Sequence, residues 1–139
     1  MSGVTDLDEL LKTMEPALAE GRFVYACVPA DALVSHLFRE PIGIFRETEG
    51  VTLIVPIAAA EGLSASPPMR LITLTVQSSL EAVGLTGAFA AALTREGISA
   101  NVVAAYHHDH IFVPERDAER ALDALRALSR AAREKGEGR

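Results

Sequence analysis

The His-His-Asp-His segment at residues 107–110 is the densest group of chemically active side chains in the sequence. On a continuous strand, His108 and His110 would project from one face, where two imidazoles can bind a metal ion, and Asp109 would project from the other face. The only other histidine is His36, and no pair of cysteines is present. The chain therefore offers no second pair of ligands for a tetrahedral zinc site.

An internal repeat offers a different interpretation of the histidine segment. A short apolar strand that ends at a proline occurs at residues 53–56 and again at 111–114, and each copy runs into a segment that can begin a helix. The repeat sets residues 107–110 against residues 47–50, which read as the tip of a hairpin, and aspartate favours turns. The sequence therefore predicts a turn at the histidines. A ligand or interface role and a metal site at His108 and His110 remain the alternatives.

Few other groups could act in catalysis. Ser78 and Ser79 could be combined with a histidine and Asp109 as a triad, but no nucleophile-elbow motif surrounds either serine. Gly84 and Gly87 do not form a phosphate loop, because no Lys-Ser/Thr pair follows them. We therefore expect a protein that is not an enzyme and that needs no cofactor.

Composition predicts a globular cytoplasmic protein. The 139 residues are 49% hydrophobic, which supplies a core for one domain or two small ones, and a net charge of −6 argues against nucleic acid or an anionic membrane as partner. No apolar stretch approaches the about 20 residues of a membrane helix, and the acidic residues 1–15 are unlike a signal peptide. The single cysteine, Cys27, lies in an apolar run and is predicted to be a buried, inert thiol.

Periodicity predicts a mixed α+β chain. In the first half the expected elements are a helix over 7–14 capped by Thr5, a strand over 22–28, a helical turn over 31–38, strands over 44–47 and 51–55, and a short helix over 57–63. In the second half they are a strand over 71–77, a helix from Ser78 and Ser79 to about Glu96, a strand over 98–106 that buries Ala104 and Tyr106, a strand over 111–113, and an amphipathic helix from Ala118.

The second half lacks one strand. Its order βαββα becomes a ferredoxin-like βαββαβ unit only with a further strand, which residues 135–139 cannot form. That strand has to come from the first half or from another subunit. The predicted division is an N-terminal helix over 1–20, a first, abbreviated unit over 21–68, a second unit over 69–134 and a disordered tail over 135–139.

The second half also carries a family resemblance. Residues 84–99 resemble the helix-to-strand segment of ACT domains, small regulatory modules that bind amino acids. Residues 101–114 resemble a group of short bacterial stand-alone proteins with two ACT-like units, related to the paired ACT domains of aspartate kinases and of the eukaryotic arginine sensor. The similarity extends over residues 21–128. It implies two ferredoxin-like ACT units with antiparallel sheets and shared or exchanged strands.

The resemblance also implies a binding site. ACT domains pair side by side and hold an amino acid at the interface between them, which implies a homodimer here and the ligand-binding residues Ser78, Ser79, Glu81, Val83, Gly84, Ser99, Asn101 and Val102. The free N–H groups at a helix N-terminus suit the ligand carboxylate, and Glu81 could bind its ammonium group.

The chain departs from the family at one position of this site. Many ACT domains have Asn two residues after the glycine that ends the helix, whereas this chain has Ser99 there and Asn101 two residues later, on the same strand face. Both could instead be ordinary polar residues of an exposed strand. The alternative functions are a ligand-free scaffold and, after it, a small metal-binding protein or enzyme.

Overall fold

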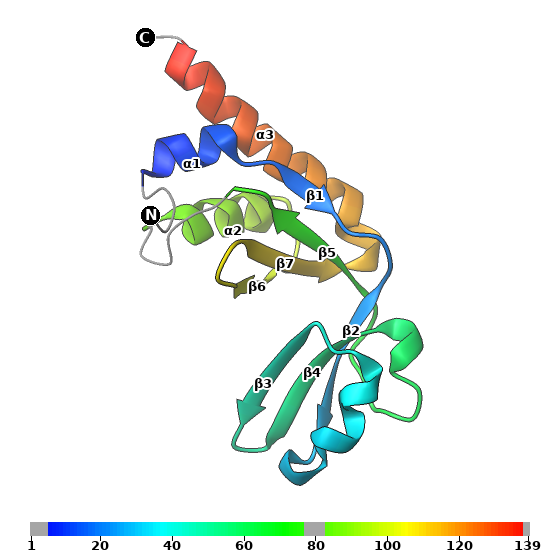
Figure 1. Ribbon diagram of the computed structural model, residues 1–139. Helices are drawn as coiled ribbons and strands as arrows, with labels where there is room; N and C mark the ends of the chain where they lie inside the picture. The colour runs from blue at the N-terminus through cyan, green and yellow to red at the C-terminus, as the bar shows by residue number, and fades with distance from the viewer. Residues whose placement is uncertain (1–5, 77–82, 138–139) are drawn as a thin grey trace. The chain divides into compact units, whose positions relative to one another are not determined.

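The computed structural model describes residues 6–76 and 83–137. The chain forms two compact units, of which unit 1 comprises Met1–Ala19 and Leu71–Arg139, and unit 2 comprises Glu20–Arg70. Unit 1 is therefore discontinuous in sequence (Figure 1). Within the described ranges, no helix has the length and apolar character needed to cross a membrane.

Unit 2 is built on an antiparallel sheet in the order β3-β4-β2, from β2 (Phe23–Val28), β3 (Gly43–Glu47) and β4 (Gly50–Pro56). On the side of β2 away from β4, Phe23 pairs with Met69, and Ala26 pairs with Ala65. The helical segments described in this unit are the 3-10 helices η1 (Ala30–Ala32), η2 (Val34–Arg39) and η3 (Ile57–Ala59). Alternate residues of β2 and β4 form the core, whose buried members are Val24, Val28, Val51, Leu53 and Val55. The partly buried side chains that pack against it are Leu33, Ile57, Ala59, Ala60 and Leu63.

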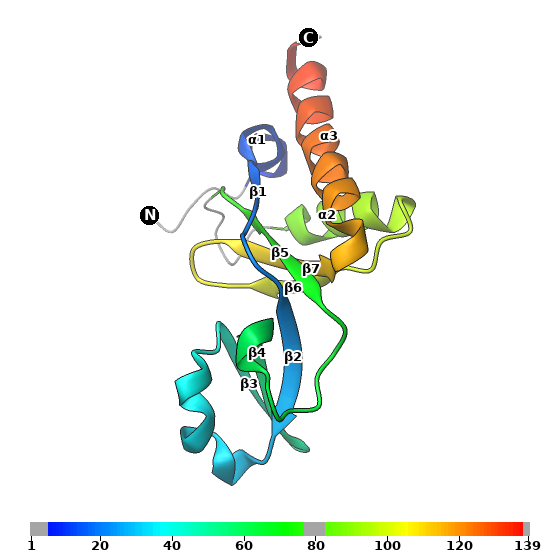
Figure 2. The ribbon, with the colours of Figure 1, turned by 90° about the vertical axis from the view of Figure 1, so that its right-hand side faces the viewer.

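The described part of unit 1 has three α-helices, one 3-10 helix and a four-stranded sheet. Its elements are α1 (Leu7–Thr13), β1 (Pro16–Leu18), β5 (Met69–Leu74), α2 (Leu85–Arg95), β6 (Asn101–Ala104), β7 (Asp109–Pro114), η4 (Glu115–Asp117) and α3 (Ala118–Glu137). The strand order is β1-β5-β7-β6 (Figure 2). All three α-helices contribute to one core with Ile72, Leu74, Ile111 and Val113 of the central strands. The predicted α+β class with antiparallel sheets is confirmed.

The missing strand of the second half comes from the N-terminal segment. β1 pairs antiparallel with β5, and Pro16, Ala17 and Leu18 lie opposite Leu74, Thr73 and Ile72. β1 therefore takes the place of the final strand of the βαββαβ unit, although it precedes β5, α2, β6, β7 and α3 in the sequence. Of the two sources predicted for this strand, the structure shows the first half of the same chain.

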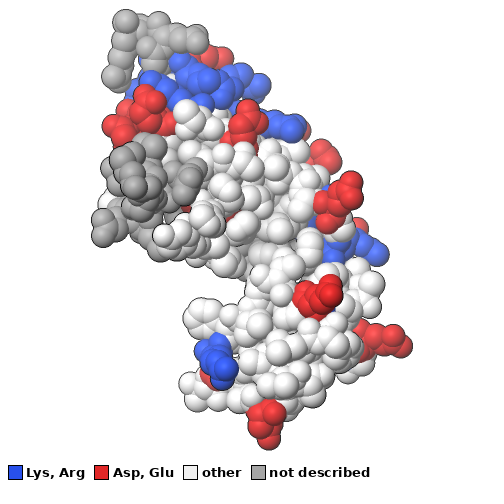
Figure 3. Space-filling model, viewed as in Figure 1, with Lys and Arg blue, Asp and Glu red and all other residues white. Residues whose placement is uncertain are grey.

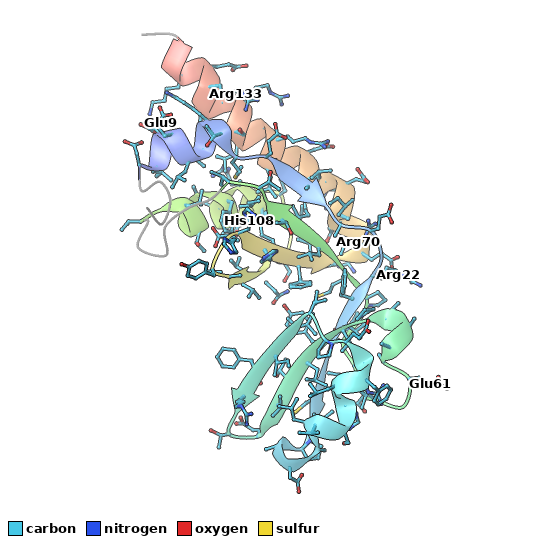
Figure 4. The ribbon with its side chains drawn as sticks, viewed as in Figure 1. Glu9, Arg22, Glu61, Arg70, His108 and Arg133 are labelled. Atoms are coloured by element: carbon cyan, nitrogen blue, oxygen red, sulfur yellow. The ribbon has the colours of Figure 1, made fainter. Side chains whose placement is uncertain are left out.

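The N-terminal helix α1 belongs to the core of unit 1. Leu10 is fully buried and Met14 is 1% exposed, in the same cluster as residues of α2 and α3. Two side chains of α3 also hold the end of α1: Ser129 Oγ donates to the Met14 carbonyl at 3.1 Å, and Arg133 Nη1 donates to the Lys12 carbonyl at 3.2 Å (Figure 4). Asp6 caps α1 by accepting from the Glu9 amide at 3.1 Å, whereas the predicted cap, Thr5, lies outside the described residues.

Several element boundaries differ from the sequence prediction, and α3 extends to Glu137, into the tail predicted to be disordered over 135–139. Helix α2 begins at Leu85 and not at the serines, since Gly84 has a φ of +96°, a left-handed conformation that suits glycine and interrupts a helix. The strand predicted over 98–106 is paired only over Asn101–Ala104. Ala104 and Tyr106 are exposed, Tyr106 by 74%, because the strand lies at the sheet edge and the chain turns directly after it.

Cys27 was predicted to be buried, and this prediction is wrong: its side chain is exposed. Along β2, Val24, Ala26 and Val28 face the core, so Cys27 projects from the opposite face of the sheet beside Thr52. The apolar run alone could not distinguish these two faces.

The exposure of Cys27 predicts that its thiol is accessible in the native protein. We expect Ellman's reagent to titrate one thiol per chain without denaturant, because no unfolding is needed to reach the sulfur. The rate of colour formation at 412 nm checks this, with the Cys27→Ser variant as the blank. A thiol that reacts only in guanidinium chloride would contradict the placement of Cys27.

Candidate functional site

The first part of the candidate site lies at the N-terminal end of α2. Val83 is 83% exposed, and Gly84 contacts Leu7 of α1 so closely that an added Cβ would lie 3.1 Å from Leu7 Cδ2. The amides of a first helical turn lack intrahelical acceptors, and the helix dipole makes this end favourable for anions. The other residues predicted here, Ser78, Ser79 and Glu81, lie outside the described residues.

The second part lies at the start of β6. Ser99 and Asn101 are exposed, while Val102 is half-buried against the core of unit 1. Asn101 Nδ2 donates to the carbonyl of Phe112 on β7 at 3.4 Å, a long hydrogen bond that leaves the Oδ1 atom available. β6 is an edge strand, so the candidate residues lie beside main-chain groups that no described strand pairs.

Within unit 1 the structure does not bring these two parts together. Gly84 precedes α2 and Ser99 follows it, and 11 helical residues rise about 16 Å along the helix axis. A free amino acid is much shorter than this helix. One copy of the domain therefore cannot place both groups on the same ligand.

The histidine segment forms a hairpin turn, as predicted, but the turn is shifted. The last strand pair is Ala104 with Asp109, and the Ala105 amide donates to the His108 carbonyl at 3.0 Å, which puts Tyr106 and His107 at the tip. The register equates these two tip residues with 48 and 49 of the β3–β4 hairpin. The alignment of residues 107–110 with 47–50 is therefore two residues out of register.

His110, the histidine of β7, contacts the hydroxyl group of a threonine on β5. Thr73 Oγ1 lies 2.9 Å from His110 Nδ1, and Asp109, on the opposite sheet face, is buried. Burial lowers the pKa of His110 and the neighbouring charge of His108 lowers it further, with Asp109 opposing them. His110 is therefore neutral near pH 7. In the described part of the chain, no three His, Cys, Asp or Glu side chains are grouped so as to hold a metal ion.

Unit 2 contains a shallow pocket of about 390 Å³ on the face that carries Cys27. Its lining residues are Tyr25, Ala26, Cys27, Thr52, Ser64, Ala65 and Ser66. Ser66 Oγ already accepts from the Tyr25 amide at 2.9 Å, and burial raises the pKa of the Tyr25 phenol, which keeps it neutral. With no charged side chain in its lining, the pocket does not suit the two charges of a free amino acid.

Both halves of the sequence match family models described as ACT domains, over residues 2–68 and 67–127. The chain belongs to the ACT domain family and contains two ACT domains in tandem. ACT domains are regulatory modules that bind small molecules, and this defines the class of function. The matches follow the order of the sequence, whereas in the structure β1, from the first matched segment, completes the sheet of unit 1.

Several solved structures share this fold. A Vibrio cholerae protein of unknown function, described as a possible transport protein, is 50% identical, with a TM-score of 0.81 over 88% of this chain and 95% of that chain. An Agrobacterium tumefaciens protein is 18% identical, with a TM-score of 0.71 over 84% and 89%. The regulatory subunit of aspartate kinase from Thermus flavus is 13% identical, with a TM-score of 0.62 over 84% and 98%. A search of the curated proteins gives no match.

Proposed function

We propose that this protein is a cytoplasmic regulatory module that binds a free amino acid at the interface between ACT domains and acts as a homodimer. The observation that carries the proposal is the presence of two ACT domains, one of which exposes both the N-terminal end of α2 and Asn101 on an edge strand. Neither His110, whose pKa is lowered by burial, nor the uncharged pocket of unit 2 suits a charged ligand.

The two parts of the site complement different groups of an amino acid. The first-turn amides of α2 suit the carboxylate, and Glu81 supplies a negative charge for the ammonium group. Asn101 has a free acceptor and can also donate, so it can bind either group. Since about 16 Å of helix separates the two parts in one domain, a second ACT domain has to contribute one of them.

A thermal-shift screen of the twenty amino acids tests this function. A ligand that binds only the native state raises the melting temperature, and the shift grows with ligand concentration. We expect one or a few chemically related amino acids to do so at millimolar concentration, and the D-enantiomer to be weaker. If none of the twenty changes the melting temperature, the protein does not sense free amino acids.

A further inference from the structure

The pocket of unit 2 lies on the face of its sheet that is turned away from the core of that unit. Cys27 and Thr52 both line it, and they are opposite each other on β2 and β4, where they alternate with core residues such as Val28 and Leu53. Small-molecule sites usually have volumes of about 300–1,000 Å³. A volume of about 390 Å³ therefore gives room for one small ligand.

One wall of this pocket is fixed to the sheet. Residues 64–66 form the wall, and Ala65 pairs with Ala26 of β2. Ser66 adds two hydrogen bonds to Tyr25: its Oγ atom accepts from the Tyr25 amide at 2.9 Å, and its amide donates to the Tyr25 carbonyl at 2.9 Å. A wall that is already ordered lowers the entropic cost of binding a ligand.

The lining of the pocket carries no charge. None of the described side chains that line it belongs to Asp, Glu, Lys, Arg or His, so an ionised ligand would lose water there without gaining a partner. Glu47 accepts a hydrogen bond from Thr52 Oγ1, but it is exposed outside the lining, so water and salt screen its charge. On the face drawn in Figure 3, charged side chains gather over α1 and α3 and are scattered over unit 2. The pocket therefore favours an uncharged ligand.

Two groups of the lining define the chemistry of the ligand further. The ring of Tyr25 attracts a second aromatic ring, and the shallow floor formed by Cys27 and Thr52 allows a flat ring to lie on it. The Ser64 hydroxyl has no hydrogen-bond partner among the described residues, so it can donate to a ligand or accept from it. The Ser66 hydroxyl, by contrast, already donates to the carbonyl of the next residue at 3.1 Å. A suitable ligand therefore combines a flat ring with a group that hydrogen-bonds to Ser64.

We propose that the pocket of unit 2 binds a small, uncharged compound that has an aromatic ring and one hydroxyl or similar hydrogen-bonding group. The ring lies over Cys27 beside Tyr25, and Ser64 binds the polar group. This site is separate from the amino-acid site of the proposed function and does not depend on it. The protein then has two kinds of ligand site, one for a charged amino acid and one for a neutral ring compound.

Four probes of nearly the same size test the proposal: benzyl alcohol, benzoate, benzylammonium and cyclohexylmethanol. They differ in charge or in the planarity of the ring. We expect benzyl alcohol at millimolar concentration to cause saturable shifts of the amides of residues 25–27 and 64–66 in ¹H–¹⁵N correlation spectra of the full chain near neutral pH. Benzoate and benzylammonium should bind at least about tenfold more weakly, because the pocket offers no partner for their charges. Cyclohexylmethanol should bind at least about twofold more weakly, because it lacks the aromatic contact with Tyr25.

The thiol of Cys27 provides a second measurement. A ligand on the pocket floor covers this thiol, so benzyl alcohol at about ten times its dissociation constant should slow alkylation by iodoacetamide about tenfold. Cys27→Leu fills the floor and should abolish the shifts, and Ser64→Ala should weaken binding at least about threefold. Ser35→Ala, the same change on η2 and outside the pocket, should leave binding unchanged. Circular dichroism melts show whether each variant is folded.

The proposal is overturned if benzyl alcohol causes no saturable shift in the pocket, if the charged probes bind as tightly, or if alkylation of Cys27 is not slowed. Binding that persists in a folded Cys27→Leu variant, or that Ser64→Ala and Ser35→Ala affect equally, would also overturn it. If Cys27→Leu does not fold, the alkylation rate and the two serine variants decide. None of these results depends on the amino-acid screen, so a negative outcome for one site leaves the other standing.

Discussion

Replacing Leu10 with alanine should lower the free energy of unfolding by about 2–5 kcal/mol. Leu10 is fully buried in a core that also contains residues of α2, α3, β5 and β7, so its removal leaves a cavity where the N-terminal segment joins the rest of unit 1. Urea denaturation followed by circular dichroism measures the change. Hydrogen exchange of α3 should accelerate in parallel, because α1 and α3 are in direct contact.

The matched control for this prediction is Leu37→Ala. Leu37 is 46% exposed in η2, so the same chemical change removes much less buried surface and should cost less than about 1 kcal/mol. An effect of Leu10→Ala as small as that of the control would mean that α1 is not part of the core. The account of β1 as the fourth strand of unit 1 would then lose its support.

Replacing Asn101 with alanine should weaken amino-acid binding at least about tenfold, which corresponds to the loss of about 1.4 kcal/mol. Asn101 is exposed and makes only one long side-chain hydrogen bond, so the melting temperature of the ligand-free protein should change little. Titration calorimetry with the amino acid that stabilises the wild type measures the affinity.

Ser99→Ala is the informative comparison for Asn101. Ser99 occupies the position at which many ACT domains have asparagine, and Asn101 lies two residues later on the same strand face. A larger loss for Asn101→Ala than for Ser99→Ala is expected if the polar contact has moved along the strand. The reverse order, or unchanged affinity in both variants, would contradict the assignment of Asn101.

Regular patterns made much of the fold predictable. The alternation around Ile72 and Leu74, the apolar stripe of α3 and the repeated strand that ends at a proline each report a local preference that the structure keeps. β1 was not predictable in this way. Its three residues, Pro16–Leu18, are too short to show a period, and they become a strand only by pairing with β5, more than 50 residues away.

The site was harder to predict than the fold. Two serines before an apolar run resemble a helix cap, yet α2 begins at Leu85 after a glycine with positive φ. Strand alternation placed Tyr106 inside, although the chain turns there. Sequence spacing reports which residues share an element. The predicted helix already separated the serines from Ser99, and the bounds of α2 in the structure give the about 16 Å of helix between Gly84 and Ser99 that calls for two domains.

A titration of the ¹⁵N-labelled protein with an equimolar pool of the twenty amino acids, followed by ¹H–¹⁵N correlation spectra, tests the central claim most directly. The account predicts saturable shifts at Val83, Gly84 and Leu85 of the helix end and at Ser99, Asn101 and Val102 of the strand, because these residues would contact the ligand. Absence of any shift at millimolar concentration would contradict amino-acid binding. Shifts confined to the pocket of unit 2 would contradict the site.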